Sequence, residues 1–123
     1  MIVGLGIDLV DRERMDRLWR RFGRHLAERI LSGSELKALP ENPVDFLASR
    51  FAAKEAGVKA LGLGFRNGIN FRDLEVRNDD LGRPKLILHG KARKTALDLK
   101  ITRIDLSITH SRTAAAAVVI MQD

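Results

Sequence analysis

The chain has 123 residues, of which 45% are hydrophobic, and its 22 Lys and Arg exceed its 16 Asp and Glu, for a formal charge of +6. This length predicts one globular domain over residues 1–123. The sequence has no cysteine, which excludes disulfides, thiolate catalysis and cysteine-ligated zinc. The positive charge favours an anionic partner, and nucleic acid, a phosphorylated metabolite and an acidic protein are all candidates.

The apolar N-terminal segment predicts a buried strand over residues 2–10. It has no basic leader and reaches Asp8 too early for a signal peptide or a membrane span, so we expect a cytoplasmic protein without a membrane partner. Strand alternation places Gly4, Gly6 and Asp8 on one face, where we expect open space beside the carboxylate. Because an unpaired buried charge is costly, Asp8 needs an arginine, a helix end or a metal ion as partner.

Apolar residues at helical spacing predict a helix from residue 11 to about residue 31, with a possible break at Gly23. One side of this region carries an arginine stripe, which consists of Arg14, Arg17, Arg21 and Arg24. The stripe either faces an acidic partner or is solvated, since several acidic residues in the same region neutralise part of its charge.

A short helix is predicted over residues 36–39, and a long helix over residues 43–61, capped by Asn42 and ended by Gly62. On the long helix Phe51, Glu55 and Lys59 recur at four-residue spacing. Spacing alone favours a surface ion pair of Glu55 with Lys59, worth only about 0.3–0.5 kcal/mol, over a functional site.

The second half of the chain predicts strands over residues 71–77, 85–88, 103–109 and 114–121, with a helix over residues 91–98. The last two strands form a hairpin whose turn carries His110, either simply exposed or donating a hydrogen bond to a phosphate. The expected fold class is α+β, with a mostly antiparallel sheet packed against a long central helix and shorter helices.

Three segments, taken in order, resemble the motifs of the holo-acyl-carrier-protein synthase family of 4′-phosphopantetheinyl transferases. They are residues 4–10 (GLGIDLV) with Arg14, residues 50–62 (RFAAKEAGVKALG) and residues 107–111 (SITHS). The resemblance covers essentially the whole chain. It departs at Gly57-Val58, where the family often has a bulkier and then a small polar residue, which would loosen the helix or alter cofactor contacts.

The resemblance implies a reaction in which a carrier serine attacks the β-phosphate of coenzyme A and 3′,5′-ADP departs. It implies Mg²⁺ bound by Asp8 and Glu55, which suits an ion that needs only one or two carboxylates beside phosphate oxygens. Glu55 would accept the serine proton, directly or through a metal-bound water, and Lys59 would stabilise the pyrophosphate. The residues implied for coenzyme A binding are Arg50, Lys54, Lys59 and His110.

The resemblance also implies an acyl carrier protein that meets the arginine stripe, and a homotrimer with active sites between subunits. It does not distinguish a fatty-acid carrier from a polyketide carrier. Two other function classes are a basic nucleic-acid-binding domain and a non-catalytic trimeric scaffold. Aromatic residues make up only 5% of the chain and tyrosine is absent, which argues against base stacking. Retention of both Asp8 and Glu55 argues against a scaffold.

Overall fold

The computed structural model describes the backbone of residues 1–123 and every side chain except that of Arg66. The elements in chain order are β1 (Ile2–Asp11), α1 (Arg12–Phe22), α2 (Arg24–Ile30), α3 (Gly33–Lys37), α4 (Val44–Ala60), β2 (Leu74–Asn78), β3 (Pro84–Leu88), α5 (Gly90–Asp98), β4 (Arg103–His110) and β5 (Ala114–Gln122). Two short 3₁₀ turns, Phe65–Asn67 and Phe71–Asp73, separate α4 from β2. The predicted α+β class is confirmed.

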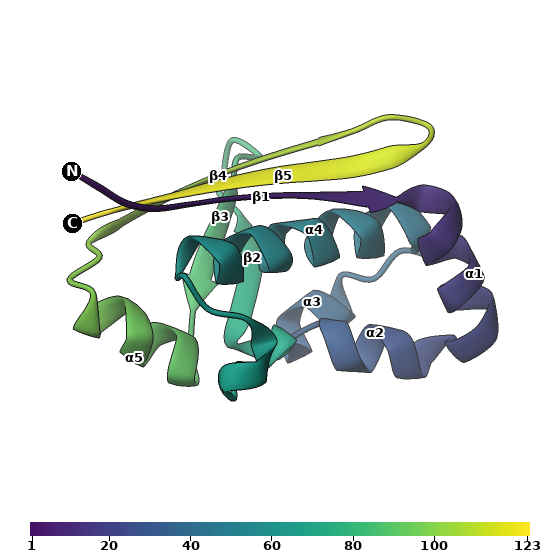
Figure 1. Cartoon of the computed structure of the whole chain (residues 1–123). Helices are drawn as coiled ribbons and strands as arrows, with labels where there is room; N and C mark the ends of the chain where they lie inside the picture. The colour runs from purple at the N-terminus through teal and green to yellow at the C-terminus, as the bar shows by residue number, and fades with distance from the viewer.

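The strands form two antiparallel sheets, one with the order β1-β5-β4 and one made of β2 and β3. Helix α4 runs along one face of the larger sheet, α1 and α2 lie beside one end of it, and α5 lies at the other end (Figure 1). The predicted hairpin of the last two strands is confirmed, with His110 opposite Ala115. On the other side of β5, Asp8 of β1 lies opposite Ala117.

The glycine face of β1 is the surface on which α4 packs. A Cβ atom at Gly4 would lie 1.8 Å from the carbonyl oxygen of Ala60, and one at Gly6 would lie 1.9 Å from that of Ala56. The expectation of open space beside these glycines is therefore wrong, because the helix backbone fills it. Their lack of side chains brings α4 close enough for its residues to reach Asp8.

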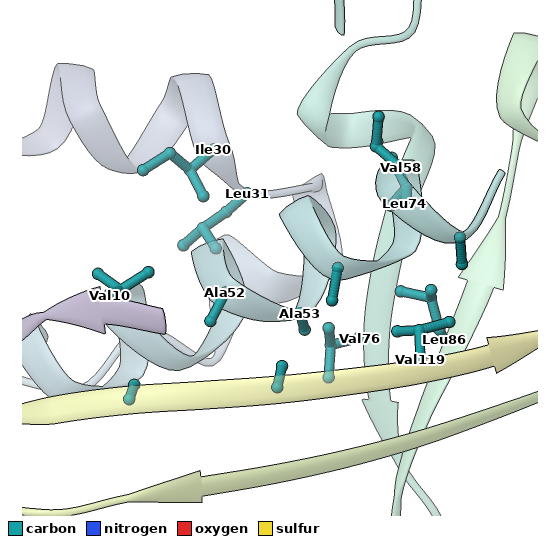
Figure 2. Packing of buried hydrophobic residues seen from close by; sticks show 14 of the residues in the cluster. Val10, Ile30, Leu31, Ala52, Ala53, Val58, Leu74, Val76, Leu86 and Val119 are labelled. Atoms are coloured by element: carbon teal, nitrogen blue, oxygen red, sulfur yellow. The ribbon is translucent and has the colours of Figure 1, made fainter. Parts of the chain in front are cut away.

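One cluster of buried apolar side chains joins the helices to both sheets. Figure 2 shows Ala52 and Ala53 on the side of α4 that faces β5, and Leu86 of β3 beside Val119 of β5. Small residues on α4 allow the helix to pack closely against the sheet. We expect this packing to fix the directions in which the polar side chains of α4 point.

The opposite face of β1 is not covered by this chain. Leu5, Ile7 and Leu9 are 62%, 66% and 71% exposed. The strand predicted as buried is therefore buried on one side only within a single chain. A row of exposed aliphatic side chains on a strand is typical of a surface that another protein covers.

Several predicted boundaries shift for local reasons. Helix α3 begins at Gly33, earlier than predicted, because Ser32 and Glu35 form a reciprocal capping box. The strand predicted from Phe71 begins only at Leu74, because Phe71–Asp73 forms a 3₁₀ turn. Helix α4 begins at Val44 with Pro43 at its cap position, without the predicted side-chain cap. The break at Gly23 is confirmed, and its φ of 54° is one that glycine adopts readily.

Among the described residues, no helix has both the length and the apolar composition needed to cross a bilayer. The cytoplasmic location stays a prediction.

Candidate active site

A cavity of about 380 Å³ opens where β1, α1 and α4 meet. Its lining residues are Asp8, Leu9, Val10, Asp11, Arg14, Met15, Leu18, Phe51 and Glu55. Asp8 comes from the strand and Glu55 from the helix that packs on its glycines. The structure thus brings together the two acids that the sequence analysis paired, with Arg14 at the same cavity.

Lys59 completes this group from the next turn of α4. Its Nζ lies 3.1 Å from Asp8 Oδ1 and donates a hydrogen bond to the carbonyl oxygen of Ile7 at 2.9 Å. The partner of Asp8 is therefore a lysine, and among the described side chains Lys59 pairs with this aspartate instead of with Glu55. The side chain of Lys59 is 52% exposed, so its ammonium is accessible from the solvent.

The electrostatics of the cavity favour a bound cation. Burial raises the pKa of Glu55, the nearby charge of Asp8 raises this pKa further, and Lys59 lowers it. A cation between the carboxylates would relieve their repulsion. The described residues contain no group of three or more His, Asp or Glu side chains arranged to hold a metal. Two carboxylates fit Mg²⁺, which commonly completes its coordination with phosphate oxygens and water.

The arginine stripe is divided between two helices. Arg14, Arg17 and Arg21 lie on α1, whereas Arg24 lies on α2 beyond the Gly23 break. Arg17 pairs with Glu13 at 3.4 Å and Arg24 with Glu28 at 3.7 Å, so part of the charge is neutralised internally. All four side chains are exposed.

A second hollow, of about 370 Å³ and mainly apolar, adjoins the first. Its lining residues are Leu18, Phe22, His25, Leu26, Arg29, Ile30, Phe51 and Phe71. Leu18 and Phe51 line both hollows. The carboxylate cavity therefore continues into an apolar groove between α1, α2 and α4, which the sequence analysis missed because its residues come from separate segments.

Arg50 and His110 lie elsewhere, in a pocket of about 320 Å³ formed by α4, the β2–β3 turn and the end of β4. Asp45, Asn78 and Pro84 also line it. The guanidinium carbon of Arg50 is 3.9 Å from the centroid of the Phe46 ring, and burial lowers the pKa of Arg50, an effect that Glu35 opposes. The Arg50 Nε atom is buried and has no hydrogen-bond partner among the described residues. An anion bound in this pocket would balance the charge of the guanidinium.

The position of Lys54 contradicts its predicted contact with coenzyme A. Its side chain is fully buried, and its Nζ donates hydrogen bonds at 2.6 Å to Glu35 Oε1 and at 2.6 Å to the carbonyl oxygen of Ile30. A phosphate cannot reach an ammonium that the protein already encloses. Lys54 thus belongs to the interior, although its neighbour in sequence, Glu55, lines the cavity.

Sequence reasoning also missed two buried acids, Glu35 and Glu75. The capping box of Ser32 and Glu35 was recognisable as a helix start, but no local pattern pairs Glu35 with a lysine nineteen residues away. Glu75 of β2 is similarly buried, with hydrogen bonds from Ser34 and His89 and an ion pair with Arg77.

The sequence pattern of the 4′-phosphopantetheinyl transferase superfamily, ACPS, matches residues 4–119. This match covers most of the chain, including β1 with Asp8 and all of α4. The chain therefore belongs to this superfamily.

More particular likenesses are to holo-[acyl-carrier-protein] synthases. The protein of that name from Nitratidesulfovibrio vulgaris (strain DP4) is 52% identical over 123 residues, which cover 99% of each chain. The crystal structure of the synthase from Neisseria meningitidis superposes with a TM-score of 0.92 at 38% identity and covers 100% of both chains. That of the Helicobacter pylori synthase in complex with coenzyme A has a TM-score of 0.84 at 30% identity, covering 96% of this chain and 99% of that one.

Proposed function

We propose that this protein is a holo-acyl-carrier-protein synthase, which transfers the 4′-phosphopantetheine group of coenzyme A to a serine of an apo acyl carrier protein. The observation that carries the proposal is the cavity in which Asp8 and Glu55 converge, with Lys59 bound to Asp8. The near-complete coverage of synthases up to 52% identical supports it, and one core formed by the described residues supports a single catalytic domain.

Asp8 and Glu55 are the residues that would hold Mg²⁺. When bound, the ion neutralises negative charge that develops on the pyrophosphate during transfer. The serine oxygen forms a bond to the β-phosphorus, the bond from that phosphorus to the 3′,5′-ADP oxygen breaks, and the serine proton moves to a base. Glu55 is our candidate for that base, because its pKa is raised within the cavity. Lys59 is placed to offset charge on the pyrophosphate or leaving group.

Arg50 and His110 are assigned to the phosphates at the nucleotide end of coenzyme A. Their pocket lies apart from the carboxylate cavity, because α4 presents Arg50 and Glu55 in different directions. A homotrimer with its active sites between subunits would let the Arg50 pocket of one subunit meet the Asp8 cavity of the next. The exposed aliphatic row of Leu5, Ile7 and Leu9 supports such an assembly.

The acyl carrier protein is assigned to the surface of α1 and α2. The arginine stripe offers positive charge for an acidic partner, and the apolar groove beside it offers contacts for aliphatic side chains. Both features border the carboxylate cavity, so a carrier bound there would present its serine to Asp8 and Glu55.

Intact-mass spectrometry tests this proposal. The protein is incubated with an apo acyl carrier protein, coenzyme A and Mg²⁺, beside a Glu55→Gln variant and a chelator control. We expect a phosphopantetheine mass gain on the carrier in the complete reaction and its loss in both controls. A folded protein that binds coenzyme A but modifies none of several carriers would contradict the catalytic claim.

A further inference from the structure

Helix α4 has two polar stripes that serve different sides of the molecule. Phe51, Glu55 and Lys59 follow one another at four-residue spacing on the cavity side. Arg50 and Lys54 have the same spacing on a neighbouring stripe, which is rotated by about 100° around the helix. The second stripe meets Glu35 of α3, and one of its residues, Arg50, also reaches the pocket with His110.

Glu35 is the centre of a largely buried hydrogen-bond network. Its Oε1 accepts from Lys54 Nζ at 2.6 Å and from the backbone of Ser32 at 2.9 Å, while its Oε2 accepts from the backbone of Val76 at 3.2 Å. Lys54 in turn donates to Ile30 at 2.6 Å. The pair therefore fixes α4 against the end of α2, against α3 and against β2. Good geometry and complete partners are the conditions under which a buried ion pair is tolerated.

Glu35 also provides the charge that offsets Arg50. The guanidinium of Arg50 lies against Phe46, and its Nε is buried without a partner among the described residues. Arg50 and Glu35 line the same pocket of about 280 Å³, and the carboxylate of Glu35 favours the charged form of Arg50. Two cations thus share this carboxylate, although Glu75 gives Lys54 some further compensation. Arg50 is the member of the cluster that lines the pocket with His110, where an anion can supply further negative charge.

We propose that Lys54 and Glu35 are positioning residues for Arg50, which set the affinity of the His110 pocket for the nucleotide phosphates of coenzyme A without acting at Asp8 and Glu55. This inference rests on the role proposed above for Arg50. Removing the pair lets Arg50 change its direction or its depth, because its nearest compensating charge and the backbone behind it are no longer fixed.

The test is a cycle of variants that removes the pair, Arg50, or both. Lys54→Met with Glu35→Leu replaces both members of the pair by apolar side chains, so that neither charge is left buried alone. Some stability is lost, because the backbone amides of Ser32 and Val76 no longer have their acceptor. Arg50→Gln removes the phosphate contact, and the third variant combines all three substitutions. Leu88→Ala, at a buried site on β3 near α5, is the control for a general loss of stability. Affinity for 3′,5′-ADP is measured by titration calorimetry, and KM for coenzyme A and kcat are measured separately.

We expect the paired substitution to raise the Kd of 3′,5′-ADP and the KM for coenzyme A about tenfold, while kcat and the dependence on Mg²⁺ change less than about twofold. Arg50→Gln should have a similar effect, and the combined variant should be no weaker than Arg50→Gln by more than about twofold. Leu88→Ala should lower the melting temperature and leave KM unchanged.

Three outcomes would overturn the inference. One is an additive loss in the combined variant, which would mean that the pair acts independently of Arg50. Another is a fall in kcat at constant KM, which would place the effect at the carboxylates. The third is an unchanged KM in Arg50→Gln, which would remove the proposed role of Arg50 as well. If the paired variant does not fold, Glu35→Gln, which keeps the side-chain shape, enters the same cycle with the same expected results.

Discussion

Two lysine–carboxylate pairs on α4 have similar chemistry and opposite surroundings. Lys59 lies 3.1 Å from Asp8 with 52% of its side chain exposed, whereas Lys54 lies 2.6 Å from Glu35 with none exposed. The half-exposed ammonium of Lys59 can move around a substrate, because water can replace the contact that it loses. The buried pair has no such alternative. On the same helix, the exposed Lys59 is accessible to a substrate, whereas the buried Lys54 stabilises the fold.

The largest effect that tests this comparison is on stability. Lys54→Met alone leaves the Glu35 carboxylate buried without its ammonium, so we expect unfolding free energy to fall by about 3–5 kcal/mol. Lys59→Met should lower it less, by about 1–2 kcal/mol, because Lys59 is half exposed, although Asp8 is only 16% exposed and loses its partner. Urea denaturation of the two variants measures both values. Equal losses would mean that burial does not separate the pairs.

The second effect concerns pH. Burial raises the pKa of Glu75, but hydrogen bonds from Ser34, His89 and Arg77 outweigh this and lower it to about 2. A carboxyl with a lowered pKa in the folded state stabilises above its unfolded value and loses that contribution as pH falls through the folded value. We expect stability to fall as the pH decreases from about 4.5 to about 2.

The control for this prediction is Glu75→Gln, which removes the titrating carboxyl and leaves His89 and Arg77 in place. The variant should be less stable than the parent at pH 7 and should lose less stability on acidification. Thermal melts recorded across this pH range give the comparison. Parallel pH profiles in the two proteins would contradict the assignment to Glu75.

The third effect is on catalysis, where we expect the exposed Lys59 to matter more than the buried Lys54. Lys59→Met should lower kcat about 100-fold, because the proposed pyrophosphate contact is lost while the fold is retained. Lys59→Arg should recover part of the activity, since it keeps the positive charge but not the compact ammonium. Steady-state kinetics with apo carrier protein provide the measurement. A Lys59→Met variant with normal kcat would remove the lysine from the mechanism.

The smallest effect extends the comparison to the arginine stripe. Arg17 is partly neutralised by Glu13 at 3.4 Å, whereas no ion pair is found for Arg21 among the described residues. Arg21→Ala should therefore raise the KM for the carrier about threefold more than Arg17→Ala does, at low salt. The difference should shrink at high ionic strength because exposed charges are screened. If the two variants behave alike at every salt concentration, the carrier does not distinguish these positions.

The elements and the acids of the cavity were predictable from the sequence because their signals are local. Gly23 and Gly62 mark helix breaks, and the motifs around Asp8 and Glu55 mark the two carboxylates. The burial of the Lys54 side chain was not predictable, because it depends on where Glu35 and Ile30 lie in space. The space beside Gly4 and Gly6 was misjudged for the same reason. A glycine indicates that another part of the backbone approaches closely, but the sequence does not show that this part is α4.

Gly57 shows how the departure from the family pattern is accommodated. A Cβ at this position would lie 2.8 Å from Leu74 Cδ2 and 2.8 Å from Leu86 Cδ2, so the leucines of the β2–β3 hairpin occupy the room that a larger residue would need. Gly57 therefore faces the hairpin, not the cavity. The side chains at positions 57, 74 and 86 fill the same space between the helix and the hairpin. In related sequences we therefore expect smaller residues at positions 74 and 86 wherever position 57 carries a larger one.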